Sequence, residues 1–387
     1  MSEWKKVNLG DCCEITSSKR IFFSEYVESG IPFYRSKEII EKGKGEEISH
    51  PLYISKEKYD EIKGKYGVPQ KGDLLLTAVG SLGIPFVVKD DSPFYFKDGN
   101  LVWLKHFQDI DPIFLYYWIK SENGYNALYN IAIGSAQKAL TIAAIKGYEI
   151  PLLPLQTQHR IANILSRYDS LIENYQKQIK LLEEAAQRLY KEWFVDLRFP
   201  GHENTKIVDG VPEGWTPSQL GQLAEFKRGK TITKKDVIDG DIPVVAGGLE
   251  PAYYCNKSNT AERVITISGS GANAGFTRMY FEKVWASDCS FVDASVTPFL
   301  HFVYCYLKAN KTTIDNMQKG AAQPHVYAKD INSLSICIPI ESVLKSFEGT
   351  ASKYFDTISS FQSQIHLLTE ARDRLLPKLM GGEIVLS

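Results

Sequence analysis

The most constraining feature of this sequence is an internal repeat. A shift of 186 in residue number places Gly134 on Gly320, and a shift of 211 places Trp4 on Trp215. The two shifts differ by 25, so the first copy carries that much additional sequence. A repeat on this scale predicts two similar structural units with similar tasks. Because the copies are unequal, we expect the two units to act on different targets.

Composition places the chain among ordinary globular proteins. Its 387 residues are enough for two domains, and 44% of them are apolar and 24% charged. No apolar stretch approaches the ~20 residues of a membrane-spanning helix, and the first ten residues do not resemble a secretory signal. The six cysteines are scattered without metal-ligand spacing. We therefore expect a soluble, cytoplasmic protein with reduced thiols and no membrane partner.

The charge balance weighs against a protein that binds nucleic acid by itself. The formal net charge is only −1, whereas domains that bind nucleic acid alone are usually basic. The argument weakens if the basic residues gather on one face of the molecule. It also weakens if a partner supplies many of the phosphate contacts.

Each copy begins with a portion of the α+β class. Short β-branched or aromatic runs bounded by Gly, Pro, Asp and Asn predict the strands of an irregular sheet. The predicted strands cover residues 73–78, 86–89, 101–104, 263–267 and 290–293, and short helices are predicted at 112–120 and 298–308. These patterns indicate one compact α+β domain in each copy.

Each copy ends in a long helix with a heptad stripe. Spacings of four and three alternate over four to five heptads, which is typical of a coiled coil. The first stripe consists of Ile161, Leu165, Tyr168, Ile172, Tyr175, Ile179, Leu182, Ala186, Leu189 and Trp193. The second consists of Phe347, Ala351, Tyr354, Ile358, Phe361, Ile365, Leu368, Arg372, Leu375 and Leu379, with one charged member. Prolines should precede both helices, and prolines or glycines should end them. These residues are Pro151, Pro154 and Pro339 before the helices, and Pro200, Gly201, Gly381 and Gly382 after them.

A single stripe of this kind is more often an ordinary core helix, but two helices of matching length and register favour an antiparallel coiled coil. Such pairing would relate the two units by a pseudo-twofold axis and would separate two domains by a rod ~50 Å long. That length exceeds one turn of DNA, roughly 34 to 36 Å. The predicted segments are a first domain at 1–153, a central helix at 154–197, a linker and second domain at 198–339, and a C-terminal helix and tail at 340–387.

Three fragments resemble enzyme motifs but do not complete them. Gly229–Thr231 resembles the end of a phosphate-binding loop, but Ala224 stands where that loop needs glycine. Asp111–Phe114 resembles a methyltransferase tetrad without its second proline, and we interpret it as a turn and a helix start. Glu61–Lys63 lacks the acidic partners of a nuclease and is interpreted as solvated surface. The seven histidines form no metal-ligand pair. We expect no catalytic residue and no metal site in this chain.

Polar loops at matching places in the two copies are the candidate binding elements. They lie at residues 17–20, 34–37, 80–83 and 134–138 in the first copy, and at 227–230, 247–248, 269–273 and 320–323 in the second. Arg and Lys can bind guanine edges or phosphate, Asn and Gln can bind adenine edges, and Gly and Ser let the backbone approach a duplex. A single Gly-Ser turn usually only connects two strands. Because such loops recur at matching places in both copies, a role in binding and a purely structural role are about equally favoured. The candidate DNA-binding residues are Lys19, Arg20, Arg35, Ser36, Lys37, Ser81, Gln137, Lys138, Lys227, Arg228, Lys230, Ser270, Asn273 and Gln323.

Several segments together match one known family. They are IPFYRSK at 31–37, GDLLLT at 72–77 followed by Gly80-Ser81, IPLLPLQTQ at 150–158, VPEGW at 211–215, AQPHV at 322–326 and LPKLMGGEI at 376–384. With them the chain resembles, over nearly its whole length, the specificity subunit of Type I restriction-modification enzymes. The second helix departs from the pattern at its entry, where Pro339–Ser342 replaces the Pro-Leu-Gln-Thr-Gln of the first.

The resemblance implies two target-recognition domains, each of which reads half of a bipartite, asymmetric sequence in double-stranded DNA. It also implies helices that space the domains and dock two methyltransferase subunits, and a restriction subunit that translocates and cuts DNA. S-adenosylmethionine, ATP and Mg would belong to these partners, and the chain itself would be non-catalytic. Shared phosphate contacts would account for its flat charge. Two alternatives stay open: a related system in which one partner combines cleavage and methylation, and a duplicated protein-interaction scaffold.

Overall fold

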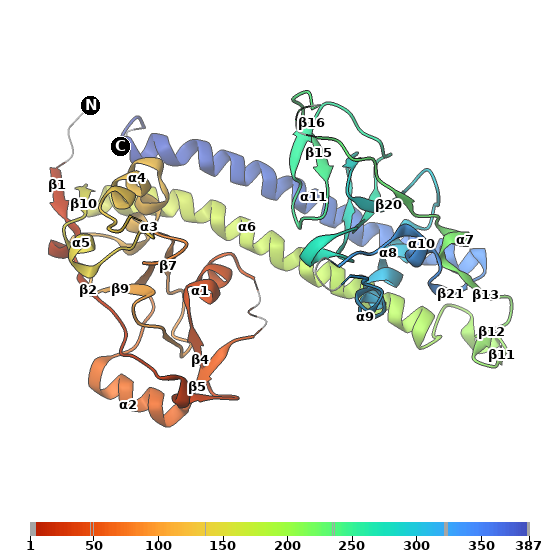
Figure 1. The fold of residues 1–387 in the computed structure, drawn as a ribbon, viewed down its shortest axis with the longest axis horizontal. Helices are drawn as coiled ribbons and strands as arrows, with labels where there is room; N and C mark the ends of the chain where they lie inside the picture. The colour runs from red at the N-terminus through yellow and green to blue at the C-terminus, as the bar shows by residue number, and fades with distance from the viewer. Residues whose placement is uncertain are drawn as a thin grey trace. The chain divides into compact units, whose positions relative to one another are not determined.

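The computed structural model consists of two compact units that each combine a β-rich domain with parts of two long helices. It describes residues 5–46, 48, 50–135, 137–233, 235, 237–320 and 324–384. Unit 1 comprises Met1–Asn174 and Gln364–Ser387, and unit 2 comprises Tyr175–Ser363. The long helices are α6 (Leu155–Tyr190) and α11 (Glu341–Met380) (Figure 1). Both units therefore contain residues of both helices.

The domain of unit 1 is built from two four-stranded sheets and one two-stranded ribbon. Its strands are β1 (Lys5–Asn8), β2 (Glu14–Thr16), β3 (Tyr26–Val27), β4 (Ile31–Tyr34), β5 (Leu52–Ile54), β6 (Leu74–Thr77), β7 (Pro85–Val87), β8 (Tyr95–Phe96), β9 (Leu101–Lys105) and β10 (Glu149–Leu152). The strand orders are β2-β9-β6-β7 and β3-β5-β4-β8, and β1 pairs with β10. All of these pairs are antiparallel except β4 with β8.

The domain of unit 2 repeats most of this topology within the described residues, with three strands in its smaller sheet and one further two-stranded pair. Its strands are β11 (Ile207–Val208), β12 (Val211–Pro212), β13 (Thr216–Gln219), β14 (Lys227–Arg228), β15 (Ile242–Val245), β16 (Tyr253–Cys255), β17 (Val264–Ser268), β18 (Thr277–Tyr280), β19 (Trp285–Ala286), β20 (Cys289–Asp293) and β21 (Ser335–Ile338). The orders are β14-β20-β17-β18 and β16-β15-β19, with β13 paired to β21 and β11 to β12. The parallel pair of the small sheet, β15 with β19, also recurs. The repeat in the sequence is thus a repeat of topology, although Trp4 lies outside the described residues.

Short helices connect the strands. Unit 1 contains η1 (Leu9–Asp11), η2 (Phe23–Glu25), α1 (Ser36–Gly43), α2 (Lys56–Tyr66), α3 (Pro112–Lys120), α4 (Glu122–Asn130) and α5 (Ile142–Lys146). Unit 2 contains η3 (Lys191–Val195), η4 (His202–Asn204), α7 (Leu220–Leu223), η6 (Gly271–Asn273), α8 (Leu300–Ala309), α9 (Lys311–Asn316) and α10 (Ala328–Asn332). The predicted strands and short helices are confirmed to within two residues at each end.

The additional sequence of the first copy forms two helices. Helix α1 connects β4 to β5, and α2 connects β5 to β6. The equivalent connections of unit 2, residues 246–252 and 256–263, are fully described and contain no helix. Unit 1 therefore presents a different surface on an otherwise similar framework.

Each domain packs on the helix segments that belong to its own unit. In unit 1, Leu165 and Leu379 are buried in one cluster with Phe114 of α3. In unit 2, Phe347 is buried in one cluster with Phe302 of α8. These helix segments are part of the domain cores, so the interpretation of the stripes as core helices holds for them.

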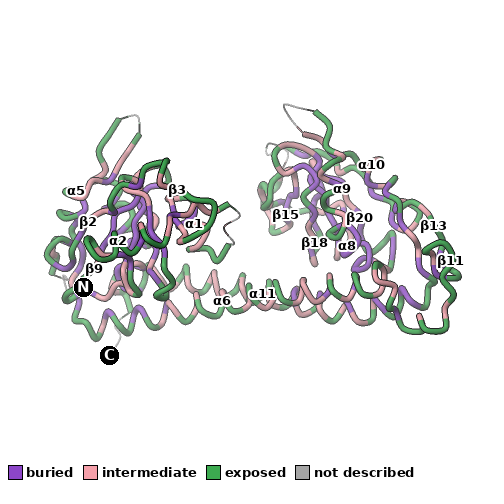
Figure 2. Tube along the Cα trace, turned by 90° about the horizontal axis from the view of Figure 1, so that it is seen from below, coloured by how far each residue is buried: buried purple, intermediate pink, exposed green. Residues whose placement is uncertain are grey.

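The heptad stripes form the buried faces of the long helices. Every stripe residue is buried or half-buried. Figure 2 shows buried, intermediate and exposed residues alternating along both long helices. By contrast, three leucines outside the stripes, Leu171, Leu181 and Leu367, are 44%, 63% and 56% exposed. Other residues outside the stripes, such as Leu344 and Phe355, are buried in the domain core of unit 2. The spacing of the apolar residues therefore predicted the buried face of both helices correctly.

Contacts within the units show that α6 and α11 run antiparallel. In unit 2 the rings of Tyr175 and Phe361 stack with their centroids 4.8 Å apart. Further along α6, the ring of Tyr190 lies 6.3 Å from that of Phe347, which is earlier in α11. The antiparallel coiled coil predicted from the stripes is confirmed within each unit. The division of the chain into four segments stays a prediction.

Three of the four helix boundaries follow the predicted prolines and glycines. Helix α6 begins directly after Pro154, and α11 begins two residues after Pro339. Helix α11 continues through Pro377 and ends at Met380, directly before the predicted Gly381.

The helical chain that begins with α6 ends within two residues of the predicted bound at 197 but before Pro200–Gly201. The α-helix ends at Tyr190 and is followed by the single π-helical turn η3 (Lys191–Val195). Leu197 then has a φ of 55°, a left-handed conformation that an α-helix does not accommodate. Neither feature involves proline or glycine, so Pro200 and Gly201 are not the residues that end this helix.

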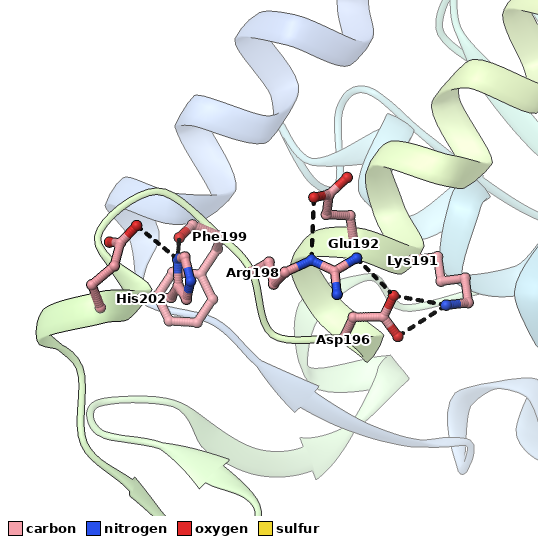
Figure 3. Close-up of polar contacts among 7 residues, drawn as sticks. Lys191, Glu192, Asp196, Arg198, Phe199 and His202 are labelled. Atoms are coloured by element: carbon pink, nitrogen blue, oxygen red, sulfur yellow. Dashed lines mark hydrogen bonds and ion pairs between the residues drawn. The ribbon is translucent and has the colours of Figure 1, made fainter.

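Charged contacts hold the chain where it leaves α6 (Figure 3). Lys191 Nζ lies 2.7 Å from Asp196 Oδ2, and Arg198 Nη2 lies 3.3 Å from the same oxygen. Arg198 Nε also lies 3.3 Å from Glu192 Oε1. The hydrogen bond from Lys191, the largest influence, lowers the pKa of Asp196. The contacts close this turn on itself at the surface of unit 2.

Arg372, the charged residue of the second stripe, belongs to a polar network in unit 1. Its Nη1 lies 2.5 Å from Oδ1 of Asp169 on α6. The hydroxyl of Tyr117 on α3 donates to Oδ2 of the same carboxylate at 2.5 Å. Burial, followed by this hydrogen bond, raises the pKa of Tyr117 above its usual range. At this position along the pair of long helices in unit 1, a hydrogen bond and an ion pair therefore connect three helices, α3, α6 and α11.

The equivalent level of unit 2 is apolar. The first shift of the repeat places Tyr117 on Val303, Asp169 on Phe355 and Ala186 on Arg372. The three unit 2 residues are at most 2% exposed and belong to one core cluster. Equivalent positions of the repeat are therefore occupied by a polar network in unit 1 and by apolar side chains in unit 2.

Within the part of the chain that the structure describes, no helix is both long and apolar enough to cross a membrane.

Candidate nucleic-acid interface

The candidate loops of unit 2 meet at one end of its larger sheet. Strands β14 and β17 end where β20 begins, as the pairs Arg228–Ser290 and Ser268–Cys289 show. Asp288, directly before β20, forms an ion pair with Arg228 and accepts a hydrogen bond from Ser270 Oγ. One carboxylate thus joins two of the predicted loops.

Hydrogen bonds add the loop at 247–248 and Pro324, which directly follows the loop at 320–323. Ser268 Oγ donates to the carbonyl of Gly247 at 3.0 Å, and Asn273 Nδ2 lies 3.5 Å from the same oxygen. The backbone N–H of Gly271 donates to Pro324 O at 3.0 Å. The predicted loops at 227–230, 247–248 and 269–273 therefore lie at one place in the fold, and Pro324, directly after the loop at 320–323, contacts one of them.

The loops of unit 1 meet in the same way around the turn between β8 and β9. Arg20 Nε donates to Asp98 Oδ2 at 2.9 Å. Ser36 Oγ and the backbone N–H of Ala78 both donate to the carbonyl of Asn100, at 3.2 Å and 2.8 Å. The loops at 17–20 and 34–37 and Ala78, two residues before the loop at 80–83, therefore share one turn.

The last loop of each copy is closed and anchored by the same pair of isolated β-bridges. The closing bridges are Ile133–Ala139 and Lys319–His325, and the anchoring bridges are Val79–Ala139 and Ser270–His325. Ala136 and residues 321–323, with the candidate Gln323 among them, lie outside the described residues.

Most of the described candidate residues are accessible. Those classed as exposed are Lys19, Arg20, Lys37, Ser81, Gln137, Lys227, Arg228 and Lys230, and those classed as half-buried are Arg35, Ser36, Lys138, Ser270 and Asn273. The structure thus brings the candidates of each copy together at the surface of one unit. Their roles in binding stay a prediction.

Arg35 also has a structural partner. Its Nε lies 3.1 Å and 3.2 Å from the carboxylate oxygens of Glu38, and its backbone N–H donates to Glu38 Oε2 at 2.9 Å. Glu38 is only 2% exposed. Burial would raise the pKa of Glu38, but the hydrogen bonds from Arg35 outweigh it and hold the pKa below its usual value. Removing Arg35 would leave a buried carboxylate without its cation, so Lys37 is the cleaner probe of DNA binding.

Exposed tyrosines that the sequence analysis did not select flank the last loops. Lys138 Nζ lies 3.7 Å from the ring centroid of Tyr129, which is 41% exposed. Lys319 and Lys329 lie 6.0 Å and 5.9 Å from the ring of Tyr327, which is 42% exposed. Neither shift of the repeat superimposes the two tyrosines, so the repeat could not have identified them.

Basic residues gather at a surface hollow in unit 1. The hollow has a volume of about 690 Å³, and its lining includes Arg20, Arg35 and Lys97 together with the carboxylate of Asp98. Phe23, also in the lining, is 87% exposed. Cationic and aromatic side chains side by side are suited to the phosphates and bases of nucleic acid. A flat net charge therefore coexists with a locally basic surface.

The sequence analysis also missed two equivalent aspartates. Asp98 stands two residues after β8, and Asp288 stands two residues after β19. A shift of 190 in residue number superimposes them. That shift, between the two used for the repeat, was the signal that could have found them.

The interpretations of the enzyme-like fragments are confirmed for two of them. Asp111 caps α3, since its Oδ1 accepts a hydrogen bond from the backbone N–H of Phe114 at 2.7 Å. Glu61 lies on α2 and pairs with Lys65 at 2.9 Å, with both side chains well exposed. Each fragment thus has an ordinary structural role.

Two similar α+β units, each with its own cluster of polar loops, define a duplicated recognition protein. A family model described as the Type I restriction modification DNA specificity domain matches residues 1–184 and again residues 212–373. The chain belongs to this family.

Relatives and a solved structure agree with this assignment. The MjaIX specificity subunit of a Type I restriction enzyme from Methanocaldococcus jannaschii is 28% identical over an alignment of 345 positions that covers 81% of this chain and 78% of the relative. The HindI specificity subunit from Haemophilus influenzae is 22% identical over an alignment covering 99% of this chain and all of the relative. The crystal structure of a Type I restriction-modification S subunit from M. genitalium has the same fold. It covers 97% of this chain and 96% of its own, with a TM-score of 0.63 at 19% identity.

Proposed function

We propose that this chain is the DNA-recognition subunit of a Type I restriction-modification complex, in which each unit reads one half of a bipartite DNA target. The observation that carries the proposal is the repeated loop cluster. In both units the described parts of these loops gather at the larger sheet, which has the same strand order in each unit, yet the loops differ in sequence. A repeated framework with different loops is suited to two different half-sequences.

The proposal assigns no chemistry to the chain itself. S-adenosylmethionine, ATP and Mg would be bound by partner subunits, and methylation and cleavage would take place there. The partners would also supply phosphate contacts, which suits a chain of net charge −1. The basic residues of the hollow in unit 1 and the lysines beside the exposed tyrosines would supply the phosphate contacts made by this chain itself.

Exposed leucines on the long helices support the docking of two methyltransferase subunits. Leu181 and Leu367 occupy equivalent places in the repeat, since the shift that places Gly134 on Gly320 also superimposes these two leucines. They are 63% and 56% exposed, and each unit contains one of them. Repeated apolar residues on an exposed helix face are suited to two copies of one partner.

Placing a charge at Leu181 should remove one methyltransferase from the complex. Leu181→Asp should leave one methyltransferase per chain, and Leu181→Asp with Leu367→Asp should leave none. Burying a leucine contributes about 2 kcal/mol, so each docking contact should weaken at least roughly 30-fold. Native mass spectrometry of the purified complex measures the stoichiometry. Leu171→Asp is the matched control, because Leu171 is exposed on α6 and has Thr357 at its repeat position. Unchanged stoichiometry in the double variant would exclude these leucines as docking residues.

Single lysine substitutions test the independence of the two units. Lys37→Ala should relax or weaken recognition of one half-site, and Lys230→Ala should affect the other, by about 1–3 kcal/mol for each base contact that the substitution removes. Methylation mapping of the complex containing each variant is the measurement. Lys56→Ala on α2 and Lys311→Ala on α9 are controls, because these lysines are exposed and pair with an aspartate on their own helix. Loss of discrimination at both half-sites from one substitution would contradict the proposal.

A further inference from the structure

The two units have an aspartate at equivalent positions, and each aspartate pairs with an arginine. The two arginines come from non-equivalent positions of the repeat. A shift of 190 superimposes Asp98 on Asp288, and a shift of 211 superimposes Ser17 on Arg228. Yet the arginine paired with Asp98 is Arg20, three residues beyond Ser17. The carboxylate is thus fixed in the framework, and an arginine reaches it from two different positions of the first loop.

In unit 1 the aspartate is the more buried partner. The Asp98 side chain is 19% exposed, whereas the Arg20 side chain is 69% exposed. Arg20 Nε donates to Asp98 Oδ2 at 2.9 Å, so one edge of the guanidinium is directed at the protein. Both residues line the hollow described above. The arginine is therefore held at the surface where the loops meet.

In unit 2 further contacts restrict the arginine. Arg228 Nη2 pairs with Asp288 Oδ1, and the other oxygen of Asp288 accepts a hydrogen bond from Ser270 Oγ. A Cβ added at Gly269 would collide with Arg228 Nη1, so the guanidinium lies directly against the backbone there. The Arg228 side chain still remains 47% exposed. A fixed but accessible guanidinium again results.

A fixed arginine suits sequence readout better than non-specific attraction. A phosphate needs only a nearby positive charge, which a mobile lysine or arginine provides. A guanine edge needs two N–H groups in a defined orientation at its O6 and N7 atoms. Holding the arginine in place before binding reduces the entropic cost of forming that contact.

We propose that Asp98 and Asp288 are positioning residues that orient Arg20 and Arg228, so that each arginine reads a guanine in its own half-site. This inference rests on the proposed function, because it names one contact within each half-site. In this inference the arginines contact the bases, and the aspartates fix the orientation of the arginines.

The test uses the full chain in complex with its methyltransferase partner and a DNA library randomised in both half-sites. Asp98→Asn keeps the size of the side chain and removes its charge. It should reduce discrimination at one guanine of one half-site roughly 5- to 100-fold and leave the other half-site unchanged. Asp288→Asn should do the same in the second half-site. Binding to non-specific DNA should be equal or slightly tighter, because a negative charge is removed.

Two arginine variants and two controls complete the design. Arg20→Ala should relax the same base pair as Asp98→Asn, and the double variant should be no worse than Arg20→Ala alone. Arg20→Lys keeps the charge and should still lose that discrimination, which tests the inference even if Asp98→Asn unfolds. Asp60→Asn and Asp315→Asn, each paired with a lysine on its own helix, should preserve all base preferences.

The outcomes separate the inference from the proposed function. If the aspartate variants bind all sequences more tightly or weakly with unchanged base preference, the aspartates act on phosphate alone and the inference is wrong. Retained discrimination in Arg20→Lys would also overturn it. If the wild-type complex shows no sequence preference, the proposed function fails before the inference is tested.

Discussion

Replacing Arg372 by alanine should lower the free energy of unfolding by about 1–3 kcal/mol, because it leaves a half-buried carboxylate without its cation. The Arg372 and Asp169 side chains are only 18% and 22% exposed, so water screens the pair incompletely. Tyr117 would still donate to Asp169 but carries no compensating charge. Hydrogen exchange of the α3 and α6 amides in unit 1 measures the destabilisation locally.

Two variants show whether the ion pair is the cause. Arg374→Ala removes an arginine from the same helix whose side chain is 77% exposed and pairs with Glu370, and should cost no more than about 0.5 kcal/mol. The triple variant Tyr117→Val, Asp169→Phe and Arg372→Ala transfers the apolar residues of unit 2, and should recover most of the stability. If Arg372→Ala and Arg374→Ala lower the free energy of unfolding equally, the half-buried network stabilises the fold no more than an exposed ion pair does.

Inserting seven residues into both long helices should lengthen the unspecified spacer of the DNA target by roughly three base pairs. Each helix gains ~10 Å at 1.5 Å per residue, and a base pair spans ~3.4 Å. Insertions next to Tyr175 and Phe361, whose rings stack, add one heptad at matched levels and keep apolar residues facing each other. Methylation mapping of the complex gives the spacer length directly.

A mismatched insertion is the control for this experiment. Two residues added to α6 alone rotate the stripe beyond the insertion by about 200°, which turns its apolar face away from α11. The variant should fail to assemble an active complex. An active double heptad variant with an unchanged spacer would show that the helices do not determine the distance between the half-sites.

The long helices were predictable because their signal is periodic. Every residue of the heptad stripes is buried or half-buried, whereas Leu181 and Leu367, which lie outside the stripes, are exposed. The strand order of unit 2 also follows from the repeat, since similar sequences fold alike. Periodicity and repetition each involve many residues. A prediction from them therefore holds even when one position, such as Arg372, departs from the pattern.

The individual contacts were not predictable because they join residues that are distant in sequence. The partner of Arg372 is Asp169, far earlier in the chain, and no spacing rule connects them. Asp98 was overlooked because the loops were chosen by matching segments, and Arg20 and Arg228 reach their aspartates from unmatched positions. The π-helical turn after Tyr190 and the left-handed Leu197 are not marked by proline or glycine. Such features arise from the packed fold and not from local pattern.

The most direct test of the central claim is methylation mapping in a host that carries this chain with its methyltransferase partner. The account predicts one bipartite, asymmetric target sequence. It further predicts that exchanging the unit 1 loops for those of a relative changes one half of that sequence and preserves the other half. A single continuous target, or a change in both halves after exchange of one unit's loops, would contradict the account.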